Sequence, residues 1–121
     1  MAFLADVSLD AALAVIVSNV TTLFICNAEP ATYAAASGAN KLGTKNPITV
    51  GTPGDRAPNG RKVTVPAITD GVVNTSGTAS HWALCSGTVL YATGALSATQ
   101  AVTAGNAFTL AAFDVGIPDA V

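Results

Sequence analysis

The single histidine is the first place to look for catalysis, because imidazole is the usual general base near neutral pH. His81 lies in residues 80–85 (SHWALC), four positions before the thiol of Cys85. The segment reads as a strand, where these two side chains share a face about 13 Å apart at about 3.3 Å per residue. A nucleophile and its base need hydrogen-bond reach. Same-strand chemistry between these two residues is therefore disfavoured.

Cysteine chemistry rests on two residues, Cys26 and Cys85. With His81 they lack the close spacing of structural zinc ligands, so we expect no metal site. The favoured interpretation is two buried thiols that behave as small apolar side chains. A disulfide is the alternative, and by the chain-entropy model it would close a loop of about 60 residues and contribute about 4 kcal/mol.

A glycine-rich segment, residues 38–45 (GANKLGTK), comes close to a phosphate-binding loop. That loop needs lysine directly after its second glycine and then serine or threonine, whereas Thr44 and Lys45 stand in the reverse order. Residues 46–50 (NPITV) also predict extended chain rather than the required helix. The carboxylates are scattered, and Asp55 next to Arg56 predicts only a local ion pair. We expect no cofactor and no enzymatic activity.

The amino-acid composition excludes several classes of protein. Of 121 residues, 50% are apolar and only 10% are charged, with a net charge of −2. This apolar content excludes a disordered chain, and the charge excludes a nonspecific nucleic-acid binder. The apolar run 11–26 has no basic residue before it and contains several polar residues, so we expect neither a signal peptide nor a membrane span.

The basic residues form one cluster in the sequence. All of them lie between positions 41 and 62, namely Lys41, Lys45, Arg56, Arg61 and Lys62. We expect this segment to be one exposed edge. It would serve either as a basic contact for an acidic partner surface or as a solvated loop that keeps a nearly neutral protein soluble.

The N-terminal segment 1–20 is a helix or an extended arm. Ser8 is a possible N-cap, and apolar residues follow it at helical spacing, with Leu9 and Leu13 among them. The β-branched residues in 15–20 favour the extended alternative. Either form buries apolar side chains, against its own domain or against another subunit.

The rest of the chain, 21–121, reads as one antiparallel β-sandwich-like domain. Residues 21–27 predict a central strand with apolar side chains on both faces, and 29–36 predict a short helix ended by Ser37 and Gly38. Further strands are predicted at 48–52, 61–69, 80–86, 88–93, 101–103 and 107–114. Turn signals accompany them at 59–60, 70–71, 76–77, 86–87 and 105–106. The expected fold class is mainly β.

The small number of charged residues predicts that this protein associates with other chains. A chain with so few charged residues must expose apolar side chains. The interface candidates are Phe3, Leu4, Val7 and Leu9 in the N-terminal segment, the basic residues Lys41, Lys45, Arg56, Arg61 and Lys62, and Trp82 as a core or interface anchor.

Several segments carry a family resemblance. They are 24–33 (FICNAEPATY), 60–65 (GRKVTV), 79–84 (ASHWAL), 93–97 (TGALS), 108–110 (FTL) and 113–118 (FDVGIP). They resemble a family of small virion structural proteins of tailed bacteriophages and prophages. The resemblance implies a protein that decorates or links the capsid, commonly as a trimer where capsomers meet.

The resemblance leads us to expect a non-enzymatic virion protein on the capsid surface, made in the cytoplasm of the host bacterium. Its partners would be other copies of itself and the major capsid protein or other virion proteins. A neck, collar or tail-fibre subunit is an alternative. Another is a carbohydrate- or receptor-binding module in which Trp82, Tyr33 or Tyr91 stacks on a sugar. The last is a small hydrolase that uses Cys85 or Ser80.

Overall fold

The computed structural model describes residues 5–57 and 59–117. Its internal contacts group these residues into two compact units. The helix–sheet unit takes its described residues from 5–20, 49–67 and 111–117, and the curled-sheet unit comprises 21–48 and 68–110. The expected mainly β, antiparallel fold with an N-terminal helix and one short further helical segment is confirmed. The division into segments 1–20 and 21–121 stays a prediction.

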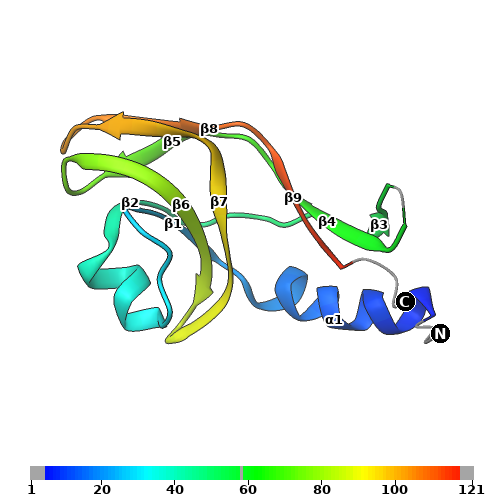
Figure 1. The fold of residues 1–121 in the computed structure, drawn as a ribbon. Coiled ribbons are helices and arrows are strands. Elements are labelled where there is room, and N and C mark those ends of the chain that lie inside the picture. The colour runs from blue at the N-terminus through cyan, green and yellow to red at the C-terminus, as the bar shows by residue number, and fades with distance from the viewer. Residues whose placement is uncertain (1–4, 58, 118–121) are drawn as a thin grey trace. The chain divides into compact units, whose positions relative to one another are not determined.

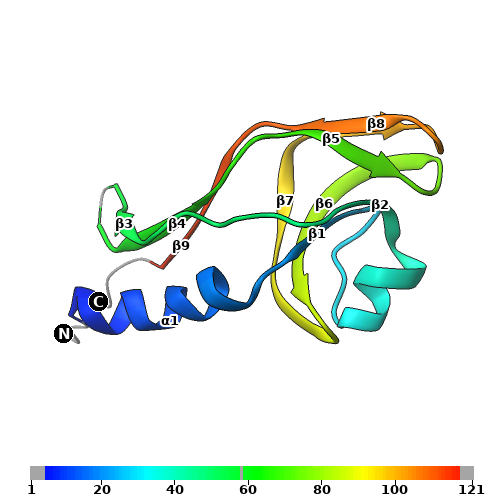
Figure 2. The same ribbon diagram turned by 180° about the vertical axis from the view of Figure 1, so that it is seen from behind.

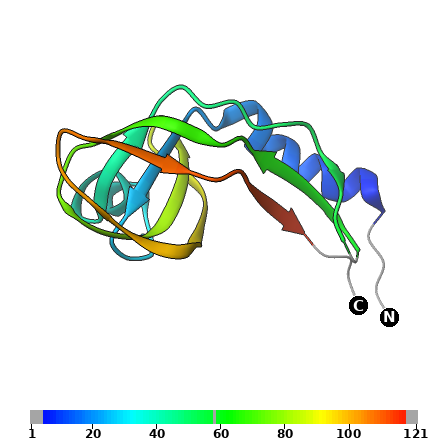
Figure 3. The ribbon, with the colours of Figure 1, turned by 90° about the horizontal axis from the view of Figure 1, so that it is seen from above.

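The curled-sheet unit is one antiparallel sheet of six strands. Its strands are β1 (Thr22–Cys26), β2 (Lys41–Lys45), β5 (Ile68–Val73), β6 (Gly77–Ser86), β7 (Val89–Val102) and β8 (Ala107–Leu110). Their order is β7-β6-β1-β2-β5-β8. Seen from above, the sheet curls round on itself (Figure 3).

Strand β1 is buried on both faces, as predicted for a central strand. Phe24 and Cys26 point to one face, where they pack with Ala83 and Cys85 of β6 and with Ala36. Ala36 belongs to η1 (Ala35–Ala39), a π-helical turn that contacts β1 and β2 and lies beside them in Figures 1 and 2.

Two glycines let the curled sheet hold large rings. Gly94 pairs with Trp82 across β7 and β6, and a Cβ at position 94 would lie 2.5 Å from the indole Cζ2. Gly71 pairs with Phe108 across β5 and β8, and a Cβ there would lie 2.2 Å from the ring. Glycine in a strand often marks such a close approach. The rings therefore occupy the space that side chains at 71 and 94 would fill.

The helix–sheet unit has two layers. Helix α1 (Asp6–Asn19) contacts β4 (Arg61–Val65), which lies between β3 (Gly54–Asp55) and β9 (Phe113–Ile117) (Figure 3). Leu9 and Leu13 of α1 are buried, as are Val63 and Val65 of β4. Lys62, Thr64 and Asp114 occupy alternate positions, so their side chains lie on the opposite face of the sheet.

The helix boundaries differ from those expected. Helix α1 begins at Asp6, so Ser8 lies in its first turn and is not the N-cap. The second helical segment covers 33–39 instead of 29–36. The hydroxyl of Thr32 accepts a hydrogen bond from the Ala35 N–H at 3.1 Å, which starts the helix after Pro30 rather than at it.

Some strand boundaries were also wrong. Segment 48–52 is not a strand, and the predicted strand 61–69 divides into β4 and β5 around Pro66, which has no N–H to donate. The predicted strands 88–93 and 101–103 belong to the single strand β7, whereas 107–114 divides into β8 and β9. Strand β2 was not predicted, and Gly71, expected in a turn, lies inside β5.

Candidate interaction site

The residues with possible nucleophilic chemistry lie within the curled-sheet unit. Cys26 pairs with His81 across β1 and β6, whereas Cys85 pairs with Thr22 at the other end of the ladder. The His81 Nδ1 lies 2.8 Å from the Ser80 Oγ. The Cys26 thiol instead faces the carbonyl oxygen of Ala36 at 3.9 Å.

Both thiols are free and buried. Burial raises the pKa of Cys26 to about 11, with a further contribution from Cys85, and burial raises the pKa of Cys85 to about 11 as well. A nucleophilic cysteine needs its thiolate form and access to substrate. At neutral pH these thiols are protonated core groups. The described residues also contain no cluster of three or more metal-ligating side chains.

The five cations are divided between the units. Lys41 and Lys45 lie on β2 of the curled-sheet unit, and Arg56, Arg61 and Lys62 belong to the helix–sheet unit. All five are partly buried. The ammonium of Lys41 lies 5.9 Å from the centre of the Phe24 ring, and Lys45 pairs with Asp70 at 2.9 Å.

Arg61 and Lys62 are also neutralised by carboxylates of their own unit. Arg61 pairs with Asp10 of α1 at 2.7 Å and with Asp55 of β3. The predicted pair between Asp55 and Arg56 is therefore wrong, because Asp55 turns to the cross-strand Arg61. The hydrogen bond to Asp10, followed by that to Asp55, raises the pKa of Arg61.

Asp114 of β9 neutralises Lys62. It accepts hydrogen bonds from the Lys62 ammonium at 2.9 Å and the Thr64 hydroxyl at 2.7 Å. These bonds, chiefly that from Lys62, lower the pKa of Asp114. Its carboxylate is thus a fixed, compensated charge on the open face of the small sheet.

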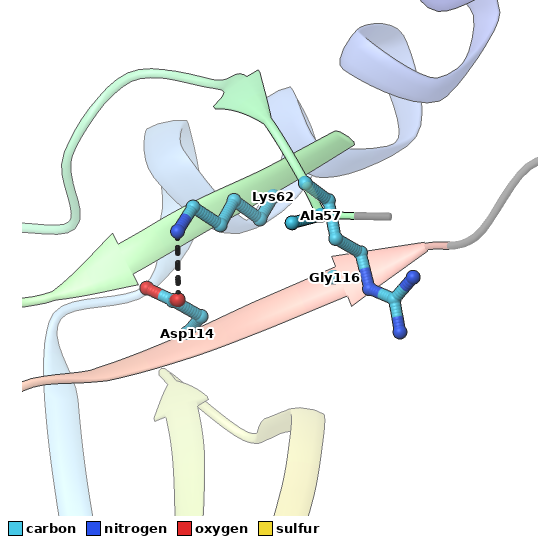
Figure 4. Close-up of a pocket in the computed structure, with 5 residues that line it drawn as sticks. Ala57, Lys62, Asp114 and Gly116 are labelled. Carbon is cyan, nitrogen blue, oxygen red and sulfur yellow. Dashed lines mark hydrogen bonds and ion pairs between the residues drawn. The ribbon is translucent and has the colours of Figure 1, made fainter. Parts of the chain in front are cut away.

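A hollow of about 400 Å³ lies beside this pair. It is lined by Arg56, Ala57, Lys62, Asp114 and Gly116, and Figure 4 shows Lys62 reaching across to Asp114. Arg56 differs from the other arginine because no carboxylate pairs with it among the described residues. The hollow with Arg56 is the candidate binding site.

The apolar interface candidates fall into three groups. Phe3 and Leu4 lie outside the described residues. Leu9 is buried in the helix–sheet unit, and Trp82 is only 8% exposed in the curled-sheet unit. Val7 is 74% exposed on α1.

Val7 is one member of a larger surface that sequence reasoning missed. Ala11, Ala14, Val15 and Ser18 are exposed on the same helix, and we call these five residues the α1 outer face. Each of them lies three or four positions from another member, which places them along one side of a helix. That spacing was visible in the sequence. Nothing in it distinguished this side from the buried one.

No family model matches this chain, and no curated protein or solved structure matches it either. Among the described residues, no helix has the length and apolar character that a membrane crossing requires.

Proposed function

We propose that this protein is a non-enzymatic structural component of a tailed-phage virion. It self-associates and binds the capsid exterior, where it decorates, links or stabilises capsid subunits. The sequence resemblance suggests the setting. The observation that carries the proposal is the α1 outer face, an uncharged and largely apolar surface presented by one helix.

The α1 outer face has the chemistry of an assembly contact. Val7 is 74% exposed and Val15 is 48% exposed, with alanines between them that allow close approach of another backbone. Fully burying a valine side chain contributes about 1.5–3 kcal/mol. Each contact is then modest, but many copies bound to one shell act together.

Electrostatic repulsion between copies of this protein is weak. Lys45, Arg61 and Lys62 each pair with a carboxylate of their own unit, and the chain carries a net charge of only −2. Copies therefore meet with weak electrostatic repulsion. A trimer at the junctions of capsomers, with the major capsid protein as partner, is the arrangement that we propose.

The α1 outer face is also compatible with a neck, collar or tail-fibre subunit. An inventory of the proteins in separated particle parts distinguishes these subunits from a capsid protein. Sugar binding through Trp82 has less support, because the indole packs against Gly94 and is only 8% exposed. Stacking on a sugar needs an open aromatic face.

The direct test is a mass-spectrometric inventory of separately purified heads and tails. We expect the chain in heads, and we expect the double substitution Val7→Glu with Val15→Glu to reduce its copy number. Val72→Glu is the matched control, because Val72 is 55% exposed on the curled-sheet unit. Absence from heads and tails, or equal incorporation of the double variant and the control, would contradict the proposal.

A further inference from the structure

We propose that the hollow beside Arg56 binds a carboxylate side chain, Asp or Glu, of a partner protein. The inference rests on the proposed function only for the source of that side chain, a neighbouring virion subunit. The binding chemistry itself belongs to the residues of the helix–sheet unit.

The first support is the charge of Arg56. Its Nη1 donates a hydrogen bond to the Asn59 carbonyl oxygen at 3.0 Å, a neutral partner. A guanidinium has five N–H donors in a planar fork that matches a carboxylate. Among the described residues Arg56 pairs with no carboxylate, so this fork retains donors for an external anion.

The second support is the way Gly116 positions the arginine. A Cβ at position 116 would lie 2.7 Å from the Arg56 Cδ and 3.0 Å from its Nε. The side chain of Arg56 thus lies directly against the β9 backbone, and a side chain at position 116 would displace it. This contact and the hydrogen bond to Asn59 hold the guanidinium before any ligand arrives, which lowers the entropy cost of binding.

The third support is the hollow itself. Its volume of about 400 Å³ falls within the usual range for ligand sites, roughly 300–1,000 Å³. Arg56 and Lys62 supply two cations at its wall, against the one carboxylate of Asp114. Because Lys62 and Thr64 already compensate Asp114, the charge of Arg56 is left to attract the ligand.

The charge of Arg56 indicates which class of ligand the hollow binds. One guanidinium that pairs with no carboxylate of the described residues matches the single charge of a carboxylate ligand and can bind it through two parallel hydrogen bonds. Nucleic acid and multiply charged phosphate groups call for several free cations. Of the five Lys and Arg residues, three are held by internal carboxylates. A protein carboxylate is therefore the ligand that this site fits.

The test is an NMR titration of the full chain with an acetylated, amidated tetraglutamate peptide. We expect saturable shifts of the Ala57, Lys62 and Gly116 amide signals, and no shifts with the matching tetraglutamine peptide. Arg56→Gln should weaken binding about tenfold, as expected for a lost charge-assisted pair. Lys45→Gln, which removes an ion-paired cation of the other unit, is the control and should bind as the parent does.

Gly116→Ala tests the positioning of Arg56 without removing its charge. We expect weaker binding, while unchanged amide signals of Val63 and Val65 would show that the small sheet stays folded. Equal binding by Arg56→Gln and the parent, or no saturable shift at all, would overturn the site. Inorganic phosphate that binds as tightly as the peptide would overturn its selectivity for carboxylates.

The particle inventory separates this inference from the proposed function. Peptide binding by a chain that is absent from heads and tails would leave the site standing and refute the virion role. Normal incorporation of a chain that fails to bind the peptide would refute the site and leave the virion role standing.

Discussion

The two units hold their strands together in different ways. In the curled-sheet unit, Trp82 and Phe108 fill the space above Gly94 and Gly71, and β1 is buried on both faces. In the helix–sheet unit, helix α1 packs against β4, the middle of three strands, and ion pairs link Asp10, Arg61 and Asp55. The first arrangement depends on the size of side chains, and the second depends partly on charge.

This contrast assigns different tasks to the units. The curled-sheet unit contains most of the buried apolar side chains, and their burial stabilises its fold. The helix–sheet unit instead presents the α1 outer face and the hollow beside Arg56. Loss of packing should therefore be most damaging in the curled-sheet unit, and loss of surface chemistry should matter most in the helix–sheet unit.

The largest effect is expected for Trp82→Ala. The buried indole has no other side chain to replace it above Gly94, so the change should leave a cavity and cost about 3–5 kcal/mol. Hydrogen exchange of the β1 and β6 amides, which resolves individual units, measures the loss. A cost below about 1 kcal/mol would contradict the buried position.

Leu13→Ala is the counterpart in the helix–sheet unit. Leu13 is buried between α1 and the small sheet, but a two-layer unit can close more easily around the missing atoms. We expect a cost of about 2 kcal/mol, near the lower end for such substitutions. Exchange of the Val63 and Val65 amides reports it, and a loss larger than that of Trp82→Ala would reverse the comparison.

Alkaline pH should weaken the curled-sheet unit through its thiols. The pKa values of Cys26 and Cys85 are raised to about 11 from 9.0, so folded chains keep protons that unfolded chains lose. The contribution of the thiols to stability is thus complete below pH 9 and is lost as pH rises toward 11, by up to about 1.4 kcal/mol per pH unit for each thiol. In the Cys26→Ala, Cys85→Ala double variant, the pH dependence in this range should be shallower. An unchanged slope would contradict the burial of the thiols.

The smallest effect is expected for Asp114→Asn. The lowered pKa of Asp114 means that its ion pair stabilises the folded chain above the ordinary carboxyl pKa of 3.8, and that this contribution is lost as pH falls further. The half-exposed pair should contribute under about 1 kcal/mol at neutral pH. Unfolding curves at pH 7 should separate the two proteins slightly, and the difference should shrink as pH falls below 3.8. A gap that persists in acid would contradict the assigned charge.

Sequence patterns correctly predicted those strands and turns that depend on residues close together in the chain. The alternation in 21–27 indicated both faces of β1, and glycines 87 and 105 mark turns where φ is positive. Gly71 was misread because its partner, Phe108, comes from a strand far along the chain. Strand β2 (KLGTK) has the composition of a loop, and its neighbours β1 and β5 make it a strand.

The sequence also predicted only part of the candidate site. The cluster of cations was visible in the sequence, but it did not show which of them, like Arg56, would lack a carboxylate partner among the described residues. Arg61 and Lys62 find Asp10 and Asp114 at separations of 51 and 52 residues, which only folding brings together. The α1 outer face escaped prediction because α1 is apolar on most sides, so its sequence does not indicate which side is buried.

Sedimentation velocity of the full chain, measured over a range of concentrations, tests most directly whether this protein works by assembly. We predict association that increases with concentration and that Val7→Glu with Val15→Glu abolishes, while Val72→Glu leaves it intact. A single monomeric species at every concentration would contradict the account.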